Sequence, residues 1–375
     1  MADAVLVLNA GSSSIKFALF DSFKQAVGTQ PTLFFKGQVE GIGTTPHFTA
    51  KDPVGSVLAN ERWSDAGSGH HVVLPRLLAW VEAHLGGNKV AAVGHRVVHG
   101  GRDFTAPVRL TPGIVSALGG LTPLAPLHQP HCLEPVRVLM ATRPALPQVA
   151  CFDTAFHHTL SPVATRFALP RDYEAEGVRR YGFHGLSYEY IARTLRQTAP
   201  ALASGRVVAA HLGNGASLCA MRGGVSVDTT MGFTALDGLM MGTRCGSIDA
   251  GVVLYMLQQK GLNAEQVEQL LYRQSGLLGV SGVSADVRVL LASPTGAARE
   301  AIELFVFRVA RETAALAASM GGIDGFVFTG GIGENAVEIR TMVIEALRWM
   351  GPLDIRVIPT DEEAMIAIHA IKNIA

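Results

Sequence analysis

Cysteine is scarce in this sequence, and its pattern excludes two classes of small stabilised protein. The chain has four cysteines in 375 residues, and no two of them form a C-x-x-C pair. Cysteines scattered in this way build neither a disulfide framework nor a zinc site of the usual spacing. We therefore expect reduced thiols and a cytoplasmic protein.

An excess of charge of one sign is absent as well. Lys plus Arg and Asp plus Glu both total 31, so the formal net charge is zero and no overall field attracts nucleic acid or an anionic membrane. No apolar run reaches 18 residues, and the first residues lack the basic segment and apolar stretch of a secretory signal. We expect neither a nucleic-acid partner nor a membrane partner.

The G-x-x-x-x-G-K-[ST] loop of Walker type is also missing. What the chain does have is a hydrophobic content of 48% over 375 residues, enough for two domains. Short apolar runs rich in β-branched residues alternate with longer helical patterns at 75–85, 187–197 and 299–320. This alternation predicts an α/β fold.

Two segments about 200 residues apart resemble each other. The first is VLVLNAGSSS at 5–14, and the second is VVAAHLGNGAS at 207–217. Each reads as a strand, a polar residue and a turn of small residues, which suggests an internal duplication. We place the domain boundary after Asp153, giving domains at 1–153 and 154–360.

A last helix is expected at 361–375. Thr360 and Glu363 have the spacing of a capping box, so we expect Thr360 to open this helix. We expect the helix to pack back onto the first domain.

Polar residues follow several of the predicted strands. Asn9, Asp153 and His211 stand at the ends of apolar runs, and a further run leads into 332–334. In open α/β folds, ligands bind beyond the carboxyl ends of the strands. These positions are therefore the first candidates for a site.

The turn after the first strand has the composition of a phosphate loop. Small residues let the backbone approach an anion, successive N–H groups and the Ser12 hydroxyl can bind phosphate oxygens, and Lys16 adds a fixed charge. The alternative is a plain hairpin turn with solvent-facing serines. The second copy at 211–217 favours phosphate, because two such loops facing each other would clamp a nucleoside triphosphate.

The segment TGGIGENA at 329–336 contains a G-x-G-x-x-A match after a predicted strand. A dinucleotide site is disfavoured, because too little chain follows for the remaining strands of a Rossmann half. A loop that lets the backbone approach adenosine or its phosphates fits better. The alternative is a glycine-rich helix end and turn.

The motifs, taken together, resemble the acetokinase family. They stand in that family's order and cover residues 6–367: LVLNAGSSSIK, GHRVVHGG, APLHQPH, FDTAFH, RYGFHGLSYEY, HLGNGAS, MGFTALDGLMMGTRCG, TGGIGEN and TDEEAMIA. The resemblance implies two duplicated domains of the actin-like, sugar kinase and Hsp70 type (RNase H-like) with a nucleotide cleft between them. It also implies a homodimer that transfers phosphate between ATP and acetate, in both directions and directly in line, to form acetyl phosphate and ADP with Mg²⁺, for which Mn²⁺ can substitute.

The resemblance also implies roles for individual side chains. Arg96 would hold the substrate carboxylate by its planar fork, since an arginine fork matches a carboxylate. Arg244 would neutralise charge on the transferred phosphoryl group, and His184 would donate a hydrogen bond to it. His128 would orient the phosphoryl group, and His211 would bind phosphate. A salt-bridge arginine and a structural histidine are the ordinary alternatives.

Asp153 is expected to position groups rather than to transfer a proton. A simple carboxylic acid is already ionised at neutral pH, so the nucleophile needs no general base. Asp153 is therefore expected to hold Mg²⁺ through water or to orient the acceptor. Asn9 and Glu362 match the family's metal-associated positions, and oxygen ligands suit Mg²⁺. Glu362 could otherwise be a first-turn helix glutamate.

The remaining implied positions fall into two sets. Residues of the substrate pocket would surround a small alkyl group, although each could equally be plain core: Val98, Leu127, Phe183 and Ala235. Residues of the nucleotide site would be Lys16, Ser12, His211, Leu212, Gly213, Asn214, Gly215, Asp286, Val287, Arg288, Gly331, Ile332, Gly333, Glu334 and Asn335.

Some positions depart from the family pattern. Ala235 replaces a proline that lines the alkyl pocket, Asp237 replaces a glutamate, and Cys245 and Ser247 replace a serine and an aspartate. Losing the proline ring predicts room for one more methylene, and so activity with propionate. A propionate or butyrate kinase of the same family is the alternative function, and an ATP-driven switch of the actin or Hsp70 type is a remote one.

A metalloenzyme fits less well. The segment HRVVH places two histidines four residues apart, and HQPH adds two more, but the glutamate of an HExxH zinc motif is missing. The sequence therefore disfavours a zinc site.

Overall fold

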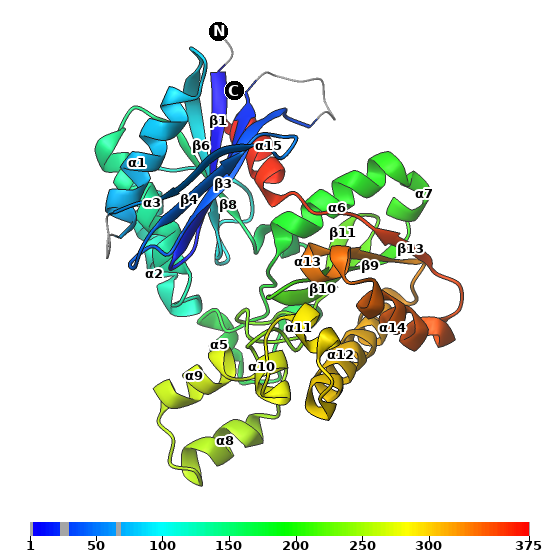
Figure 1. Cartoon of the computed structure of the whole chain (residues 1–375). Helices are drawn as coiled ribbons and strands as arrows, with labels where there is room; N and C mark the ends of the chain where they lie inside the picture. Colours follow the sequence, from blue (N-terminus) through cyan, green and yellow to red (C-terminus); the bar gives the residue numbers. More distant parts are fainter. Residues whose placement is uncertain (1–2, 23–29, 65–68, 375) are drawn as a thin grey trace. The chain divides into compact units, whose positions relative to one another are not determined.

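A computed structural model describes residues 3–22, 30–64 and 69–374 of the chain. Its contacts divide the chain into two compact units (Figure 1). Unit 1 comprises Met1–Ala155 and Asp361–Ala375, and unit 2 comprises Phe156–Thr360. The sequence placed its boundary after Asp153.

Unit 1 is built on a mixed sheet with the strand order β5-β4-β3-β2-β1-β6-β8-β7. Strand β1 pairs in antiparallel fashion with β2 and in parallel fashion with β6, and β6 pairs in parallel with β8. The strands are β1 (Asp3–Ala10), β2 (Ser14–Asp21), β3 (Leu33–Glu40), β4 (His47–Lys51), β5 (Val57–Arg62), β6 (Lys89–Val97), β7 (Val108–Arg109) and β8 (Gln148–Phe152).

Helices cover this sheet because the strands present apolar side chains on its faces. Leu6, Leu8 and Phe17 lie in one buried cluster with Leu74 and Leu77, which come from the helix before β6. Helices α1 and α3 pack together, and so do α2 and α3. The helical segments of this part are α1 (His70–Ala83), α2 (Pro112–Gly120), η1 (Thr122–Leu124) and α3 (Gln129–Thr142).

The last helix, α15 (Glu362–Ile374), contacts β1, β6 and β8. Gly94 in β6 allows this close approach. A Cβ added at Gly94 would lie 2.6 Å from a methyl carbon of Ile366, which is closer than carbon atoms pack. The start of α15 is thereby held against the strand that also carries Arg96.

Unit 2 has a smaller mixed sheet with the order β11-β10-β9-β12-β13. Strand β9 pairs in antiparallel fashion with β10 and in parallel fashion with β12. The strands are β9 (Arg206–Leu212), β10 (Ala216–Arg222), β11 (Val225–Thr229), β12 (Gly325–Thr329) and β13 (Asp354–Val357). Five consecutive strands of unit 1, β3-β2-β1-β6-β8, have the same order and the same pairing senses.

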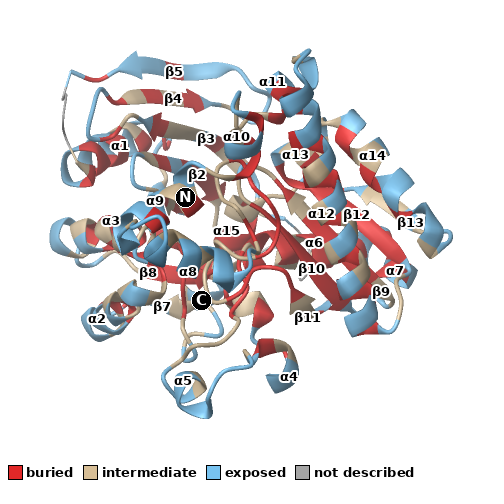
Figure 2. Cartoon of the chain, turned by 90° about the horizontal axis from the view of Figure 1, so that it is seen from below, coloured by how far each residue is buried: buried red, intermediate tan, exposed pale blue. Residues whose placement is uncertain are grey.

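Both faces of the second sheet are covered. Strand β10 is buried at every position except its last, so Figure 2 shows it largely in red. Tyr188, Ile191 and Leu195 pack against Ala209 and Cys219 on one face, and α12 contacts β9, β10 and β11.

The helical segments of unit 2 are η2 (Ala155–His157, which begins at the last residue of unit 1), α4 (Pro162–Thr165), α5 (Arg171–Ala175), α6 (Gly185–Thr198), α7 (Pro200–Ala203), α8 (Ala250–Gln258), α9 (Ala264–Arg273), α10 (Gly276–Ser281), α11 (Val287–Ala292), α12 (Gly296–Met320), α13 (Gly330–Asn335), α14 (Val337–Leu347) and η3 (Arg348–Met350).

The predicted cap of α15 is wrong by one residue. Asp361 caps the helix, because its carboxylate accepts a hydrogen bond from the Ala364 N–H at 2.8 Å. The Thr360 hydroxyl has no hydrogen-bond partner among the described residues, and its backbone N–H donates to the Glu334 carboxylate. The Thr360 N–H, which Glu363 would bind in a capping box, is thus taken by Glu334 of α13.

Among the described residues, none of the helices combines the length and the apolar character needed to cross a membrane.

Candidate active site

The turn predicted to bind phosphate is a tight hairpin between β1 and β2. Ala10 pairs with Ile15, and the Gly11 N–H donates to the Ser14 carbonyl at 2.8 Å. His70 holds the turn from α1, since its Nε2 lies 3.0 Å from the Gly11 carbonyl oxygen. Ser12 and Lys16 are exposed. The local geometry is that of the hairpin alternative, and phosphate binding there stays a prediction.

Arg96 is the centre of a polar cluster in unit 1. It donates from Nε and Nη2 to the two oxygens of Asp153 at 2.9 and 2.5 Å, and from Nη1 to Asn9 Oδ1 at 3.2 Å. Glu362 Oε2 lies 3.9 Å from its Nε. The ends of three strands and of α15 therefore bring together four predicted site residues.

Electrostatics tie this cluster together. Burial opposes the charge on Arg96, but the carboxylates of Asp153 and Glu362 outweigh it and raise the pKa of the guanidinium. Burial raises the pKa of Glu362 to about 7; Arg96 opposes this rise, and the Asp153 charge adds to it. Two carboxylates thus share one bidentate arginine, with Lys16 as a further positive charge acting on Glu362.

The donor set of this cluster fits a magnesium ion. Asn9, Asp153 and Glu362 offer only oxygen ligands, which Mg²⁺ prefers, and Mg²⁺ usually keeps several waters beside one or two carboxylates. Among the described residues, no group of three or more His, Cys, Asp or Glu side chains is placed to hold a metal. The two carboxylates and one amide match a site in which water completes the coordination.

Other predicted residues of unit 1 lie around the end of β6. Val98 is buried directly after the strand. Leu127 and His128 are partly buried and lie just before α3, with His128 at its N-cap position. Gln129 binds both the N–H and the carbonyl of His99, at 3.2 and 3.0 Å. This buried amide fixes the chain that follows Arg96 and Val98.

His184 is the centre of the corresponding cluster in unit 2. Its ring stacks on that of His211, with centroids 4.4 Å apart and planes 24° apart. Its Nδ1 lies 2.8 Å from Ser217 Oγ, and the His211 Nδ1 lies 2.9 Å from Ser187 Oγ. Phe183, next to His184, is buried and directs its carbonyl to His157. Two serines therefore hold two stacked imidazoles.

Arg244 approaches the same place. A Cβ added at Gly215 would lie 3.3 Å from His184 Nε2 and 3.9 Å from Arg244 Nη1. Gly215 therefore lets both side chains lie close to the backbone of the HLGNG loop. Arg244 Nη1 also donates to the Ala235 carbonyl at 2.9 Å, which links it to the predicted alkyl-pocket residue.

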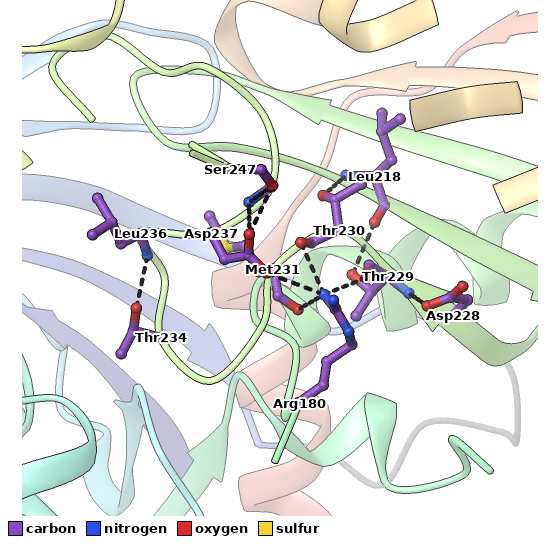
Figure 3. Close-up of polar contacts among 11 residues, drawn as sticks. Arg180, Leu218, Asp228, Thr229, Thr230, Met231, Thr234, Leu236, Asp237 and Ser247 are labelled. Carbon is purple, nitrogen blue, oxygen red and sulfur yellow. Dashed lines mark hydrogen bonds and ion pairs between the residues drawn. The ribbon is translucent and has the colours of Figure 1, made fainter. Parts of the chain in front are cut away.

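Arg180 braces the loop that carries Ala235 and Arg244. Its Nη1 donates to three successive carbonyls of 229–231 at 3.0 Å each, and it lies 3.5 Å from an Asp237 oxygen (Figure 3). Asp237 also accepts from Ser247 Oγ at 2.7 Å. The shorter acid at 237 and the hydroxyl at 247, both departures from the family pattern, thus bind each other.

A cavity of about 900 Å³ lies within unit 2. This volume is in the range of small-molecule sites. Gly213 and Gly331 line it with backbone, and an Asp286–Arg288 ion pair lies at its wall. The lining residues are Gly213, Asn214, Ala285, Asp286, Val287, Arg288, Leu291, Ala292, Gly331, Ile332, Asn335, Ala336 and Glu338.

Comparison with known proteins shows to which family the chain belongs. The family model of the acetokinase family matches residues 4–366. The chain belongs to the acetokinase family. A curated acetate kinase from Rhodopseudomonas palustris is 52% identical, and the alignment covers 98% of each chain.

Solved structures agree with this assignment. The acetate kinase of Porphyromonas gingivalis is 34% identical and superposes with a TM-score of 0.88, with 100% of both chains covered. A propionate kinase from Francisella tularensis is also 34% identical and superposes with a TM-score of 0.91 over 99% of both chains. The predicted α/β fold with duplicated domains and the predicted enzyme class, a kinase with a carboxylate acceptor that uses ATP, are confirmed.

Several residues of this acetokinase that were predicted to bind the nucleotide do not line the 900 Å³ cavity. They are Lys16, Ser12, His211, Leu212, Gly215, Gly333 and Glu334. Glu334 faces its own helix end, where its carboxylate accepts from the Gly330 and Thr360 N–H groups at 2.8 and 3.1 Å. Its side chain therefore holds the backbone of the TGGIGEN loop in place.

Sequence reasoning missed the residues that support the predicted ones. Ser187 and Tyr188 were visible within RYGFHGLSYEY, three and four residues after His184, which places them near one face of a helix. Ser217, Gln129 and Arg180 lie within HLGNGAS, APLHQPH and RYGFHGLSYEY, but their residue types did not single them out. Their partners come from other strands and loops, and only the tertiary structure brings these together.

Proposed function

We propose that this acetokinase phosphorylates acetate at the expense of ATP, with Arg96 holding the carboxylate. The supporting observation is the cluster of Arg96 with Asp153, Asn9 and Glu362. Three of the five N–H groups of a guanidinium are used in the described contacts of Arg96, which leaves two for a substrate oxygen. Asp153 fixes the orientation of the fork.

The chemistry requires charge placement more than proton transfer. Acetate is ionised at neutral pH, since its pKa lies near that of a glutamate, about 4.3, and an anionic nucleophile needs no base. Negative charge on the transferred phosphoryl group has to be neutralised by positioned donors. We assign this role to Arg244 and His184, which meet over Gly215, with His128 as an orienting group.

We propose Mg²⁺ as the metal, with Mn²⁺ able to substitute. Asn9 and Glu362 would hold it, and Asp153 would act through a water molecule. The ion would supply positive charge that neutralises phosphate oxygens. The same charge would keep the Glu362 carboxylate ionised against its burial.

For the nucleotide, we propose the 900 Å³ cavity as the adenosine end of the ATP site. Glycine backbone at Gly213 and Gly331 permits close approach of a ligand, and Val287 and Ile332 supply apolar surface. His211, Ser12 and Lys16 lie outside this lining, and we assign them to the phosphates.

The alkyl pocket decides the preferred acid. Val98, Leu127, Phe183 and Ala235 are proposed to surround the methyl group, and the alanine leaves room for one more methylene. One methylene is worth about 1–3 kcal/mol in such a pocket, so we expect propionate to be accepted as well. The similarity to a propionate kinase structure favours this second substrate.

The first experiment is a product assay. Purified protein is incubated with Mg²⁺, ATP and acetate, propionate or butyrate, and any acyl phosphate is trapped as its hydroxamate. We expect product with acetate and propionate, in a ratio of specificity constants below about 200. Product with none of the three acids, but continued ATP hydrolysis, would favour the ATP-driven switch.

We also propose a cytoplasmic homodimer. None of the four cysteines, all of which the structure describes, forms a disulfide, as suits a reducing compartment. Helix α8 has the sequence AGVVLYMLQ and buries none of its residues, with Leu254 and Tyr255 about half exposed. A second copy of this chain would cover that apolar face. We expect Leu254→Glu to shift the mass in analytical ultracentrifugation from dimer to monomer, and an unchanged mass would contradict this surface.

A further inference from the structure

We propose that the buried pair of Tyr188 and Ser217 sets which ring nitrogen of His184 carries the proton. In the family reaction His184 is proposed above to donate a hydrogen bond to the phosphoryl group, and the inference rests on that role. It adds two positioning residues and a direction of hydrogen bonding to that role.

The three side chains form a chain of hydrogen bonds. Tyr188 OH lies 2.5 Å from Ser217 Oγ, and Ser217 Oγ lies 2.8 Å from His184 Nδ1. Tyr188 and Ser217 are both fully buried. No competing exchange with bulk water can reorient these hydroxyls, so their protons follow the protein partners.

The direction of the chain follows from the acidity of its members. A phenol is a stronger acid than an alcohol, so Tyr188 is the preferred donor to Ser217 Oγ. The single proton of Ser217 is then directed at His184 Nδ1. A nitrogen that accepts a hydrogen bond carries no proton, so the neutral ring holds its proton on Nε2.

The backbone conformation and the neighbouring ring hold the His184 ring in this orientation. Among the described residues, His184 is the one non-glycine residue with positive φ, at 57°. The preceding carbonyl, that of Phe183, accepts from His157 Nε2 at 3.0 Å, and the His184 ring is stacked on His211. Stacked rings 4.4 Å apart also disfavour a positive charge on both rings at once.

As a consequence, the N–H donor of His184 points to the region beside Gly215 where the Arg244 side chain lies. Nε2 of His184 faces Gly215, beside which Arg244 Nη1 lies. With its proton on Nε2, the ring donates to a phosphoryl oxygen. With its proton on Nδ1, it would present a lone pair to that oxygen and repel it.

The test is the tautomer itself, read from long-range ¹H–¹⁵N spectra of the full-length protein labelled with ¹⁵N-histidine and free of substrates. His184→Asn identifies the signals. We expect the Nε2–H tautomer in the parent and a mixed or Nδ1–H population in Ser217→Ala. An Nδ1–H tautomer in the parent, or unchanged His184 signals in Ser217→Ala, would overturn the proposal.

Kinetics test the consequence. We expect Ser217→Ala to lower kcat by roughly 10- to 100-fold, the range known for partners that orient a metal-bound histidine, with KM for ATP and acetate nearly unchanged. Tyr188→Phe, which keeps the ring, should have a smaller effect in the same direction. An unchanged kcat in Ser217→Ala despite an altered tautomer also contradicts the role.

Controls separate this proposal from folding defects and from the proposed function. Thr313→Val and Tyr181→Phe remove buried or partly buried hydroxyl bonds to the carbonyls of Val309 and Gly177, and should leave the His184 signals unchanged. If His184→Asn retains full kcat, the catalytic assignment of His184 fails. The parent spectrum still decides the tautomer in that case.

Discussion

The two sheets share one topology and carry different chemistry at matching positions. In unit 1, Asn9 of β1 pairs with Lys16 of β2, and Arg96 of β6 donates to the Asn9 side chain. In unit 2, His211 of β9 pairs with Ser217 of β10 and with Thr329 of β12. The Asn9 amide and two cations in unit 1 thus correspond to the His211 imidazole and two hydroxyls in unit 2.

The two sheets differ in the charge that they carry at these positions. Unit 1 uses charged side chains at its strand ends, balanced by Asp153 and Glu362. Unit 2 has an imidazole and two hydroxyls at its strand ends and lets the backbone come close, as at Gly330, whose φ of 77° is open to glycine. Under the proposed function, the first would bind a small carboxylate and a metal ion, and the second would bind a bulky anionic nucleotide.

The largest expected effect concerns Arg244, the one predicted cation of the His184 cluster. We expect Arg244→Ala to lower kcat about 10³- to 10⁵-fold, the range for an arginine that neutralises a transferred phosphoryl group. ATP binding, measured by calorimetry, should persist, because Arg244 does not line the nucleotide cavity. The surface variant Arg311→Ala should behave as the parent, and equal losses of ATP binding and turnover would disprove the division of roles.

The next effect concerns the charged cluster of unit 1. Arg96→Ala leaves Asp153 and Glu362 without their shared cation, and losing one partner of a buried charge pair costs about 2–5 kcal/mol. That cost falls on folding. We expect kcat/KM for acetate to fall as well, because the substrate carboxylate loses a charged hydrogen-bond donor worth about 1.5–3 kcal/mol, and KM for ATP to stay unchanged. Arg96→Lys keeps the charge but lacks the fork, so it should recover only part of the loss. An equal rise in both KM values would count against a separate carboxylate site.

The loss of folding stability in acid tests the buried histidines of both units. Burial lowers the pKa of His95 and His99 in unit 1 and of His157 in unit 2 to about 4. Below the ordinary value of about 6.5 the unfolded chain binds more protons, so stability falls as the pH drops from 6.5 towards 4. At pH 5 each histidine should cost up to about 2 kcal/mol.

Glu362 acts in the opposite direction, since its raised pKa makes the folded chain lose stability as the pH rises from about 4.5 to about 7. Thermal unfolding at pH 7.5 and pH 5 measures the balance. We expect His157→Gln to show a smaller loss on acidification than the parent. A variant that loses as much as the parent would show that His157 is not held neutral.

The smallest effect tests the backbone approach in unit 2. A Cβ on Gly330 would lie 2.8 Å from the Leu212 carbonyl oxygen, and a left-handed conformation costs a non-glycine residue about 1–2 kcal/mol. We expect Gly330→Ala to raise KM for ATP about tenfold and to leave KM for acetate unchanged. Gly120→Ala in unit 1, where a Cβ meets open space, is the matched control. A rise in KM for acetate instead would contradict the proposal that ATP and acetate bind at separate sites.

Local sequence signals predicted much of this molecule. Alternating apolar runs and helical patterns gave the α/β class, and the repeated strand and small-residue turn at 5–14 and 207–217 indicated the duplication. The cap of α15 was misassigned because Thr360 and Asp361 are both good capping residues. The choice between them depends on Glu334, 26 residues away, which holds the Thr360 N–H.

The candidate site was predictable only where a motif names the residue. Arg96, His184 and Arg244 stand inside long motifs and carry charge or a ring that chemistry needs. Gln129, Arg180 and Ser217 lie inside such motifs too, but no motif shows which atoms they bind. Their importance comes from partners 30, 57 and 33 residues away in the chain, such as the His99 backbone, Asp237 and His184. Hydrogen bonds over such separations leave no periodic trace in a sequence.

The sequence alone therefore determined the family, the two-part α/β architecture and the types of side chain available for phosphoryl transfer. The tertiary structure decided that Arg96 is held bidentately by Asp153, that burial beside these charges raises the pKa of Glu362, and that Ser217 lies against His184 Nδ1. The physical reason is that charge state and proton position depend on distance and desolvation. Both are set by how strands and helices pack, and neither is written in any short stretch of the chain.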